Sequence, residues 1–171
     1  MLKPGDRAPG FTLTSDEGRK VSLADFAGRR VVLYFYPKAD TPGCTQQACA
    51  LRDLHPDVEE ADVTVIGVSP DAPEKLAAFR AKYDLPFVLL SDPERSVAAQ
   101  YGAWGERKLY GRTFLGVLRS HVAIDAEGRI AELDLNVKPL ETAELARRVL
   151  AGGTTNVEDA APPQRAERKA G

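Results

Sequence analysis

The sequence has little cysteine, histidine or tryptophan: 171 residues contain two cysteines, two histidines and one tryptophan. Two cysteines cannot form the disulfide framework on which small secreted domains depend. A hydrophobic content of 43% in a chain of this length allows a core that buries about two-thirds of the unfolded surface. We therefore expect one domain held together by its core, with cysteines that serve catalysis, redox sensing or metal binding.

An excess of charge of either sign is also missing. The 23 basic and 25 acidic residues give a net charge of -2, which offers no attraction to nucleic acid or to anionic lipid. No apolar run approaches the ~20 residues of a membrane span, and the opening MLKPGDRAPG does not resemble a signal peptide. We expect a cytoplasmic protein that acts on small molecules or proteins, with no membrane partner; a monomer is expected and a dimer remains the alternative.

Apolar strands alternate with amphipathic helices along most of the chain. This order predicts an α/β fold in which a mixed central sheet is flanked by helices. Strands are expected at 31–36, 63–68 and 87–90, an N-terminal β-hairpin at 11–21, a second hairpin at 121–135, and helices at 23–27, 43–54, 74–82, 91–102 and 139–150. Residues 104–118 are expected to form a long loop. The domain is predicted to span 1–152, and the polar residues 153–171 to form a flexible tail.

Both cysteines lie in the stretch VVLYFYPKADTPGCTQQACALRD, residues 31–53, which reads as strand, turn and helix. The turn places Cys44 in the first turn of the helix. Unpaired backbone N–H groups and the positive end of the helix dipole stabilise a thiolate there. Although an isolated free cysteine is more often buried and inert, this position makes Cys44 a candidate nucleophile.

The residues around Cys44 also admit plain structural interpretations. Thr41 is suited to cap the helix, although its hydroxyl can also donate and accept hydrogen bonds beside the thiol. Pro37 ends the strand and can also wall off the thiol from water. A metal site made of Cys44, Cys49 and His55 is poorly spaced, because C-x4-C within one helix does not place two sulfurs around one ion. We expect no metal and no other cofactor.

The two histidines and the aromatic residues of the expected loop admit structural interpretations. His55 is expected to end the helix that contains the cysteines, and His121 to be structural or at the surface. Trp104, Tyr110 and Phe114 either line a substrate groove or pin the loop to the core. Asp40 is expected to be solvated.

The spacing Pro37-x-x-x-Thr41-x-x-Cys44 resembles the active-site signature of the peroxiredoxins. The wider PGCTQQAC, with its second cysteine five positions on, is similar to the bacterioferritin comigratory protein (PrxQ) branch, and the similarity continues through residues 104–125. This resemblance implies a thioredoxin-like fold. It also implies a thiol-dependent peroxidase that reduces hydrogen peroxide and organic hydroperoxides without metal, haem or flavin.

The resemblance implies a role for each matching residue. Cys44 would attack the hydroperoxide and become a sulfenic acid, which Cys49 would resolve to an intramolecular disulfide. Thr41 would bind the peroxide oxygens and Pro37 would shield the sulfur. Arg119, alone an unremarkable strand-edge charge, would favour the thiolate and stabilise the breaking O–O bond. Thioredoxin or a similar dithiol would reduce the disulfide. Gln47 stands where relatives carry Glu or Gln and is assigned no chemical step.

Helix geometry adds an expectation of its own. Five residues along an α-helix separate two Cα atoms by about 8.6 Å, whereas a disulfide needs about 4.4–6.8 Å. The first turns of the helix must therefore unwind in each cycle.

Two alternative functions stay open: a protein thiol-disulfide oxidoreductase, which would favour a C-x-x-C pair that this chain lacks, and a redox-regulated holdase or binding module.

Overall fold

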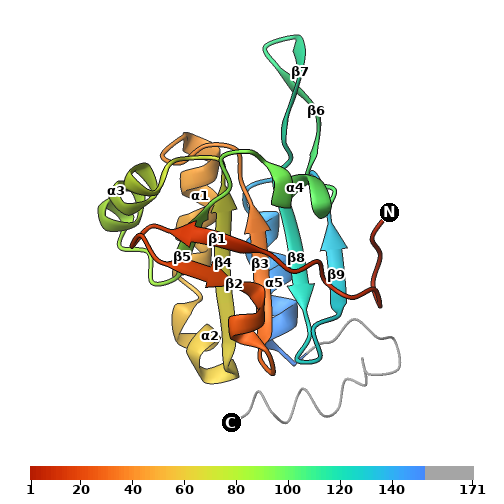
Figure 1. The fold of residues 1–171 in the computed structure, drawn as a ribbon. Coiled ribbons are helices and arrows are strands. Elements are labelled where there is room, and N and C mark those ends of the chain that lie inside the picture. Colours follow the sequence, from red (N-terminus) through yellow and green to blue (C-terminus); the bar gives the residue numbers. More distant parts are fainter. Residues whose placement is uncertain (153–171) are drawn as a thin grey trace.

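The computed structural model describes residues 1–152 and shows a seven-stranded sheet with helices on both faces (Figure 1). The strand order is β2-β1-β5-β4-β3-β8-β9, in which β3, β4 and β5 run parallel and the remaining pairs are antiparallel. The strands of this sheet are β1 (Thr12–Ser15), β2 (Lys20–Ser22), β3 (Arg30–Phe35), β4 (Val63–Ser69), β5 (Val88–Ser91), β8 (Ser120–Ile124) and β9 (Ile130–Asp134). The predicted mixed sheet and N-terminal hairpin are therefore confirmed.

Residues 1–152 also form five α-helices and one short 3-10 helix. They are η1 (Leu23–Phe26), α1 (Pro42–Arg52), α2 (His55–Ala61), α3 (Pro73–Tyr83), α4 (Ser96–Gln100) and α5 (Glu141–Leu150). Within residues 1–152, no helix combines the length and the apolar character needed to cross a membrane. The predicted tail, 153–171, lies outside the described residues, so the predicted domain boundary stays a prediction.

The central strand β3 divides its side chains between two cores. Val32 and Tyr34 face the layer formed by α1, α2, α3 and α5, whereas Val31, Leu33 and Phe35 face α4 and the N-terminal segment. All five side chains are at most 1% exposed. A continuous apolar run is what a strand requires when both faces of its sheet are covered.

Gly67 of β4 packs closely against Tyr34 of β3, in the core layer that α1 covers. A Cβ atom on Gly67 would lie 2.8 Å from the ring carbon Cζ of Tyr34, so only glycine leaves space for this ring. Tyr34 stacks on Tyr36 with ring centroids 5.4 Å apart, in the same core as Cys44. Burial raises the pKa of Tyr34 well above its ordinary value, so its phenol stays neutral.

The helix expected at 43–54 is in fact two helices. α1 ends at Arg52, and the separate helix α2 begins at His55 with Pro56 in its first turn. A proline fits there because the first turn of a helix does not use its N–H groups in intrahelical bonds. The prediction that His55 and Pro56 end a helix was therefore wrong: they begin one.

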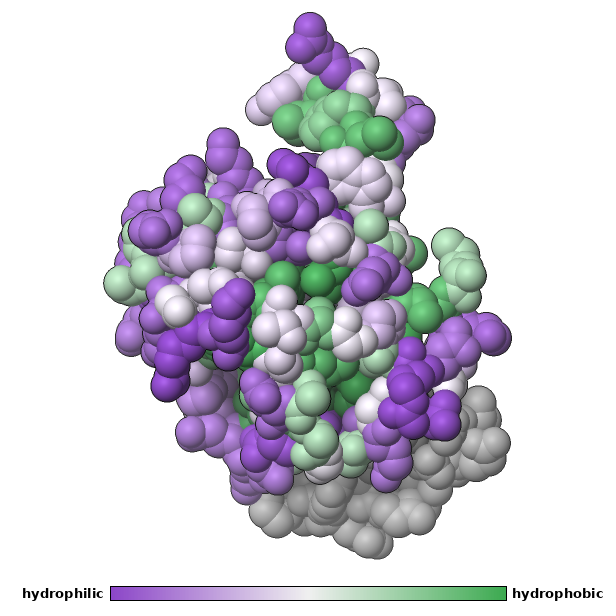
Figure 2. Space-filling view, in the orientation of Figure 1, coloured by the Kyte–Doolittle hydropathy of each residue, from purple (hydrophilic) through white to green (hydrophobic). Residues whose placement is uncertain are grey.

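The segment expected to be a loop at 104–118 is also ordered. β6 (Trp104–Leu109) and β7 (Arg112–Val117) form a hairpin that projects from the body of the protein (Figure 1). Tyr110 and Gly111 have φ angles of 53° and 77°, which is typical of the two-residue turns that join antiparallel strands. Figure 2 shows apolar residues gathered on this arm, where Tyr110 is 94% exposed. The arm's aromatic tip therefore does not pin a loop to the core.

Candidate active site

The first turn of α1 holds Cys44, as predicted. Thr41 takes an extended conformation before the helix, with φ of -99° and ψ of 160°, and Pro42 occupies the first turn. The backbone N–H of Thr45 donates to the carbonyl of Thr41 at 2.8 Å, so the helical hydrogen bonds begin just after the cysteine. Cys44 is 1% exposed and lies where free N–H groups and the helix dipole favour negative charge.

Arg119 brings a positive charge to the sulfur. It lies immediately before β8, and its Nη1 atom is 3.4 Å from Cys44 Sγ and 2.8 Å from Gln47 Oε1. A guanidinium is charged at every physiological pH and donates several hydrogen bonds from a rigid plane. The guanidinium therefore places a fixed positive charge beside the Cys44 sulfur.

Gln47 connects this arginine to the last helix. Its side chain is fully buried, and its Nε2 donates to Thr142 Oγ1 of α5 at 2.8 Å. A polar chain thus runs from Thr142 through Gln47 and Arg119 to Cys44. The i, i+3 spacing of Cys44 and Gln47 on one helix face is a signal that could have identified Gln47. No sequence signal pointed to Thr142, because the contact spans 95 positions.

The space that Arg119 occupies depends on a glycine. A Cβ atom on Gly43 would lie 2.9 Å from Arg119 Nη2 and 3.4 Å from Pro139 Cγ. Contacts under 3.0 Å require one of the two groups to move, and Arg119 is held by its hydrogen bonds to Cys44 and Gln47. Gly43 therefore contributes to the site by leaving space for the guanidinium of Arg119.

Thr41 and Pro37 flank the turn that leads into α1. Both are half-buried, and Pro37 follows the end of β3 by two residues. The hydroxyl of Thr41 donates to the carbonyl of Lys38 at 2.8 Å and makes no capping bond to the helix. Thr41 thus stands at the capping position, but its hydroxyl oxygen keeps lone pairs that can accept from another donor.

Cys49 lies on a different side of α1. It is half-buried and borders an open hollow of about 530 Å³ together with Thr41, Lys82 and Tyr83. Neither cysteine is in a disulfide. Five helical positions separate the two, so their Cα atoms are about 8.6 Å apart while α1 stays regular.

Asp40 also lines this hollow, and the expectation that it is merely solvated is wrong because its carboxylate has two side-chain partners. Its carboxylate accepts hydrogen bonds from Lys82 Nζ at 3.0 Å and from Tyr83 Oη at 2.9 Å. The hydrogen bonds from Lys82 and Tyr83 lower the pKa of Asp40 below its ordinary value. The turn before α1 is therefore tied to the end of α3.

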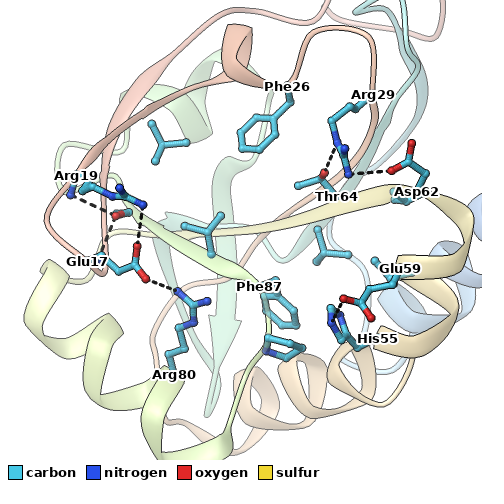
Figure 3. A pocket seen from close by; sticks show the side chains of 17 residues that line it. Glu17, Arg19, Phe26, Arg29, His55, Glu59, Asp62, Thr64, Arg80 and Phe87 are labelled. Carbon is cyan, nitrogen blue, oxygen red and sulfur yellow. Dashed lines mark hydrogen bonds and ion pairs between the residues drawn. The ribbon is translucent and has the colours of Figure 1, made fainter.

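A second hollow, of about 570 Å³, lies between α2, α3, β4 and β5 (Figure 3). Its lining contains neither cysteine. Its charged side chains pair with one another, as in Arg29–Asp62 at 3.2 Å and Arg80–Glu17 at 3.8 Å. The imidazole of His55 lies 3.4 Å from the carboxylate of Glu59 on the same helix.

His121 is structural, one of the two positions expected for it. It is fully buried and lies 3.1 Å from Glu132 Oε1, whose other oxygen is 3.3 Å from Arg148 Nη2. Among residues 1–152, the one group of side chains close enough to share a metal ion is His121, Glu132 and Asp134. Cys44, Cys49 and His55 do not form such a group.

Comparison with known proteins agrees with this geometry. The AhpC/TSA family model matches residues 4–133. A putative peroxiredoxin of Mycobacterium tuberculosis is 54% identical over 137 residues, which are 80% of this chain and 87% of the relative. The chain belongs to the peroxiredoxins. Peroxiredoxin Bcp of Escherichia coli, 51% identical over 129 residues, covers 75% of this peroxiredoxin and 83% of its own length, which supports the bacterioferritin comigratory protein branch.

Solved structures confirm the thioredoxin-like fold of this peroxiredoxin. A cysteine mutant of Xylella fastidiosa PrxQ matches with a TM-score of 0.81 and 29% identity, covering 89% of this chain and 97% of that one. The bacterioferritin comigratory protein of Xanthomonas campestris matches with a TM-score of 0.79 and 28% identity, covering 88% and 98%. Membership of the family makes this protein a thiol peroxidase, which uses a peroxide substrate and a thiol reductant.

Proposed function

We propose that this peroxiredoxin reduces hydroperoxides through Cys44. The observation that carries the proposal is the 3.4 Å contact between Arg119 Nη1 and the sulfur of Cys44 in the first turn of α1. The thiolate attacks the terminal peroxide oxygen, so that an S–O bond forms while the O–O bond breaks. The sulfur is oxidised by two electrons to a sulfenic acid, and the departing alkoxide or hydroxide takes up a proton.

The neighbouring residues stabilise this step. Arg119 donates to the sulfur and to the oxygens on which negative charge develops, an effect that is strong where water is excluded. The Thr41 hydroxyl already donates its own hydrogen to the carbonyl of Lys38, so its oxygen accepts a hydrogen bond from the O–H of the hydroperoxide. Pro37, half-buried beside the turn, limits the access of water.

Cys49 resolves the sulfenic acid. Its thiolate attacks the Cys44 sulfur, the S–S bond forms and the hydroxyl leaves as water. Because α1 holds the two Cα atoms about 8.6 Å apart, the segment between them must unwind before this bond can form. The half-buried position of Cys49 at an open hollow supports this order of events, since the segment can move outward there.

Thioredoxin or a similar dithiol then restores the enzyme. One thiolate of the reductant attacks the disulfide, and its second thiol releases the reduced enzyme and becomes part of a new disulfide. We propose hydrogen peroxide and small organic hydroperoxides as substrates. The Xanthomonas campestris bacterioferritin comigratory protein is described as having alkyl peroxide reduction activity, which supports the organic class. A reducing compartment such as the cytosol suits two cysteines that are free between turnovers.

The test follows peroxide consumption in the presence of thioredoxin, thioredoxin reductase and NADPH. We expect wild-type turnover, no turnover for Cys44→Ser, and a first oxidation without turnover for Cys49→Ser. Mass spectrometry after one equivalent of peroxide, with alkylation, should show a sulfenic acid in Cys49→Ser and an internal disulfide in the wild type. Equal rates for wild type and Cys44→Ser would exclude the peroxidase and favour a holdase or binding module.

A further inference from the structure

The interface between α1 and α5 contains one hydrogen bond between two fully buried side chains. Gln47 Nε2 of α1 donates to Thr142 Oγ1 of α5 at 2.8 Å, and both residues are 0% exposed. The other buried side chains of α5 are those of Ala143, Ala146 and Val149. A polar group buried among such neighbours is stable only while its hydrogen bond is made.

The guanidinium of Arg119 contacts the first turns of α1. It bonds to Cys44 and Gln47, and it fills the space left open by Gly43. Unwinding the segment from Gly43 to Cys49 therefore removes these contacts together. The bond from Gln47 to Thr142 instead ties that segment to a second helix, α5.

Gln47 lies between the two cysteines in the sequence. The segment cannot unwind from Cys44 to Cys49 until Gln47 leaves its buried position, and the bond to Thr142 must break when it does. Breaking that bond leaves the Thr142 hydroxyl without its partner in an apolar interface, which opposes the unwinding.

We propose that Thr142 is a positioning residue whose hydrogen bond to Gln47 sets how readily the Cys44–Cys49 segment unwinds. It thereby sets how the sulfenic acid is divided between disulfide formation and further oxidation. This inference rests on the proposed roles of Cys44 and Cys49.

The two fates of the sulfenic acid compete. In the unwound segment, Cys49 attacks the sulfur and water leaves. In the folded segment Cys49 is out of reach, and a second hydroperoxide can transfer an oxygen to the sulfur: its O–O bond breaks, an alcohol or water is released, and the sulfur becomes a sulfinic acid. A more stable folded segment therefore raises the yield of sulfinic acid at a given peroxide concentration.

The informative substitution is Thr142→Val, which keeps the shape of the side chain and removes the hydroxyl. In this variant the Gln47 amide is unsatisfied while the segment is folded, so unwinding becomes easier. We expect disulfide formation after a single oxidation to be about 5-fold faster, and half-maximal sulfinic acid formation to need about 5-fold more peroxide, as follows from one lost hydrogen bond. Thr142→Ser keeps a hydroxyl and should restore values near those of the wild type.

Ala146→Gly is the matched control, because it weakens α5 at a buried position without touching the hydrogen bond. It should lower the thermal stability and leave the sulfinic acid yield unchanged. Equal sulfinic acid yields in wild type and Thr142→Val, or the same shift in Ala146→Gly, would overturn the proposal.

Hydrogen exchange of residues 44–49 in the reduced protein tests the proposal without any peroxide. Exchange should accelerate in Thr142→Val, and unchanged exchange also overturns the proposal. Failure of the proposed function itself would be recognised separately, as a wild type that consumes no peroxide.

Discussion

At the scale of single residues, the site depends on where one guanidinium is held. Arg119 contacts the sulfur of Cys44 and the amide of Gln47, and its Nη2 lies so close to Gly43 that a Cβ atom there would be 2.9 Å away. A cation that is fixed before the reaction does not need to reorganise when charge develops. In the proposed mechanism, the reactivity of Cys44 is thus tied to side chains that carry no redox chemistry.

Gly43→Ala tests this arrangement. The new methyl group would lie 2.9 Å from Arg119 Nη2, so the guanidinium must move away from the sulfur. We expect the second-order rate constant for peroxide to fall by about 10-fold to 100-fold, as small misplacements of catalytic groups do. Thermal stability should not fall through helix propensity, because alanine favours a helix more than glycine.

Gly10→Ala provides the control for this substitution. Gly10 has no atom within 4 Å of its Cβ position and no left-handed φ, so alanine is accommodated there. The rate constant of Gly10→Ala should equal that of the wild type. An unchanged rate constant in Gly43→Ala would show that the position of Arg119 is not critical.

The sequence alone identified Cys44 but not Gly43 or Thr142. Cys44 was identified from its place between a strand, a turn and a helix, which are local features. Gly43 and Thr142 were not identified, because the contacts that give them importance join them to Arg119 and Gln47 across 76 and 95 positions. Such contacts exist only after the chain has folded.

At the scale of elements, local patterns predicted the buried sheet better than its surroundings. β3 and β4 were found because both faces are covered and nearly every residue is apolar. The projecting hairpin was missed because its strands are exposed and carry Arg107, Lys108 and Arg112 among their apolar residues. The start of α2 was missed because Pro56 can open a helix as well as follow one.

A buried ionic cluster joins β8, β9 and α5 and makes stability depend on pH. Burial raises the pKa of Glu132, but the hydrogen bond and charge of His121 and the charge of Arg148 outweigh it, so the pKa is lowered. A lowered carboxyl pKa contributes stability above its unfolded value, and this contribution is lost as the pH falls through the folded value.

Glu132→Gln should therefore reduce the free energy of unfolding at pH 7 by about 1–3 kcal/mol, the effect of disrupting a buried hydrogen-bonded group. The difference from the wild type should shrink as the pH falls below the ordinary Glu pKa of 4.5 and through the lower folded value, because the carboxylate loses its charge there. Urea denaturation at a series of pH values measures both. A difference that is constant across this range would contradict the assignment.

At the scale of the whole molecule, the outer part of the projecting arm stands apart from the two cores, although Val117 at its base is buried in one of them. Leu109, Tyr110 and Leu115 are 48%, 94% and 62% exposed, so they bury little apolar area. Replacing Tyr110 and Leu115 by serine should shift the melting temperature by no more than about 2 °C, as exposed substitutions do in a domain of this size. Leu33→Ala in β3 is the contrasting control and should lower it strongly, because that side chain is fully buried.

Both cores and every residue of the proposed site lie within residues 1–152. The end of α5 is closed inside that range: the N–H of Gly152 donates to the carbonyl of Val149, and Arg30 Nη1 donates to the same carbonyl. A protein truncated after Gly152 keeps these bonds. We expect it to match the full chain in circular dichroism, melting temperature and the rate constant for peroxide. A truncated protein that melts at a lower temperature or reacts more slowly would show that residues 153–171 belong to the functional domain, against the boundary expected from their polar composition.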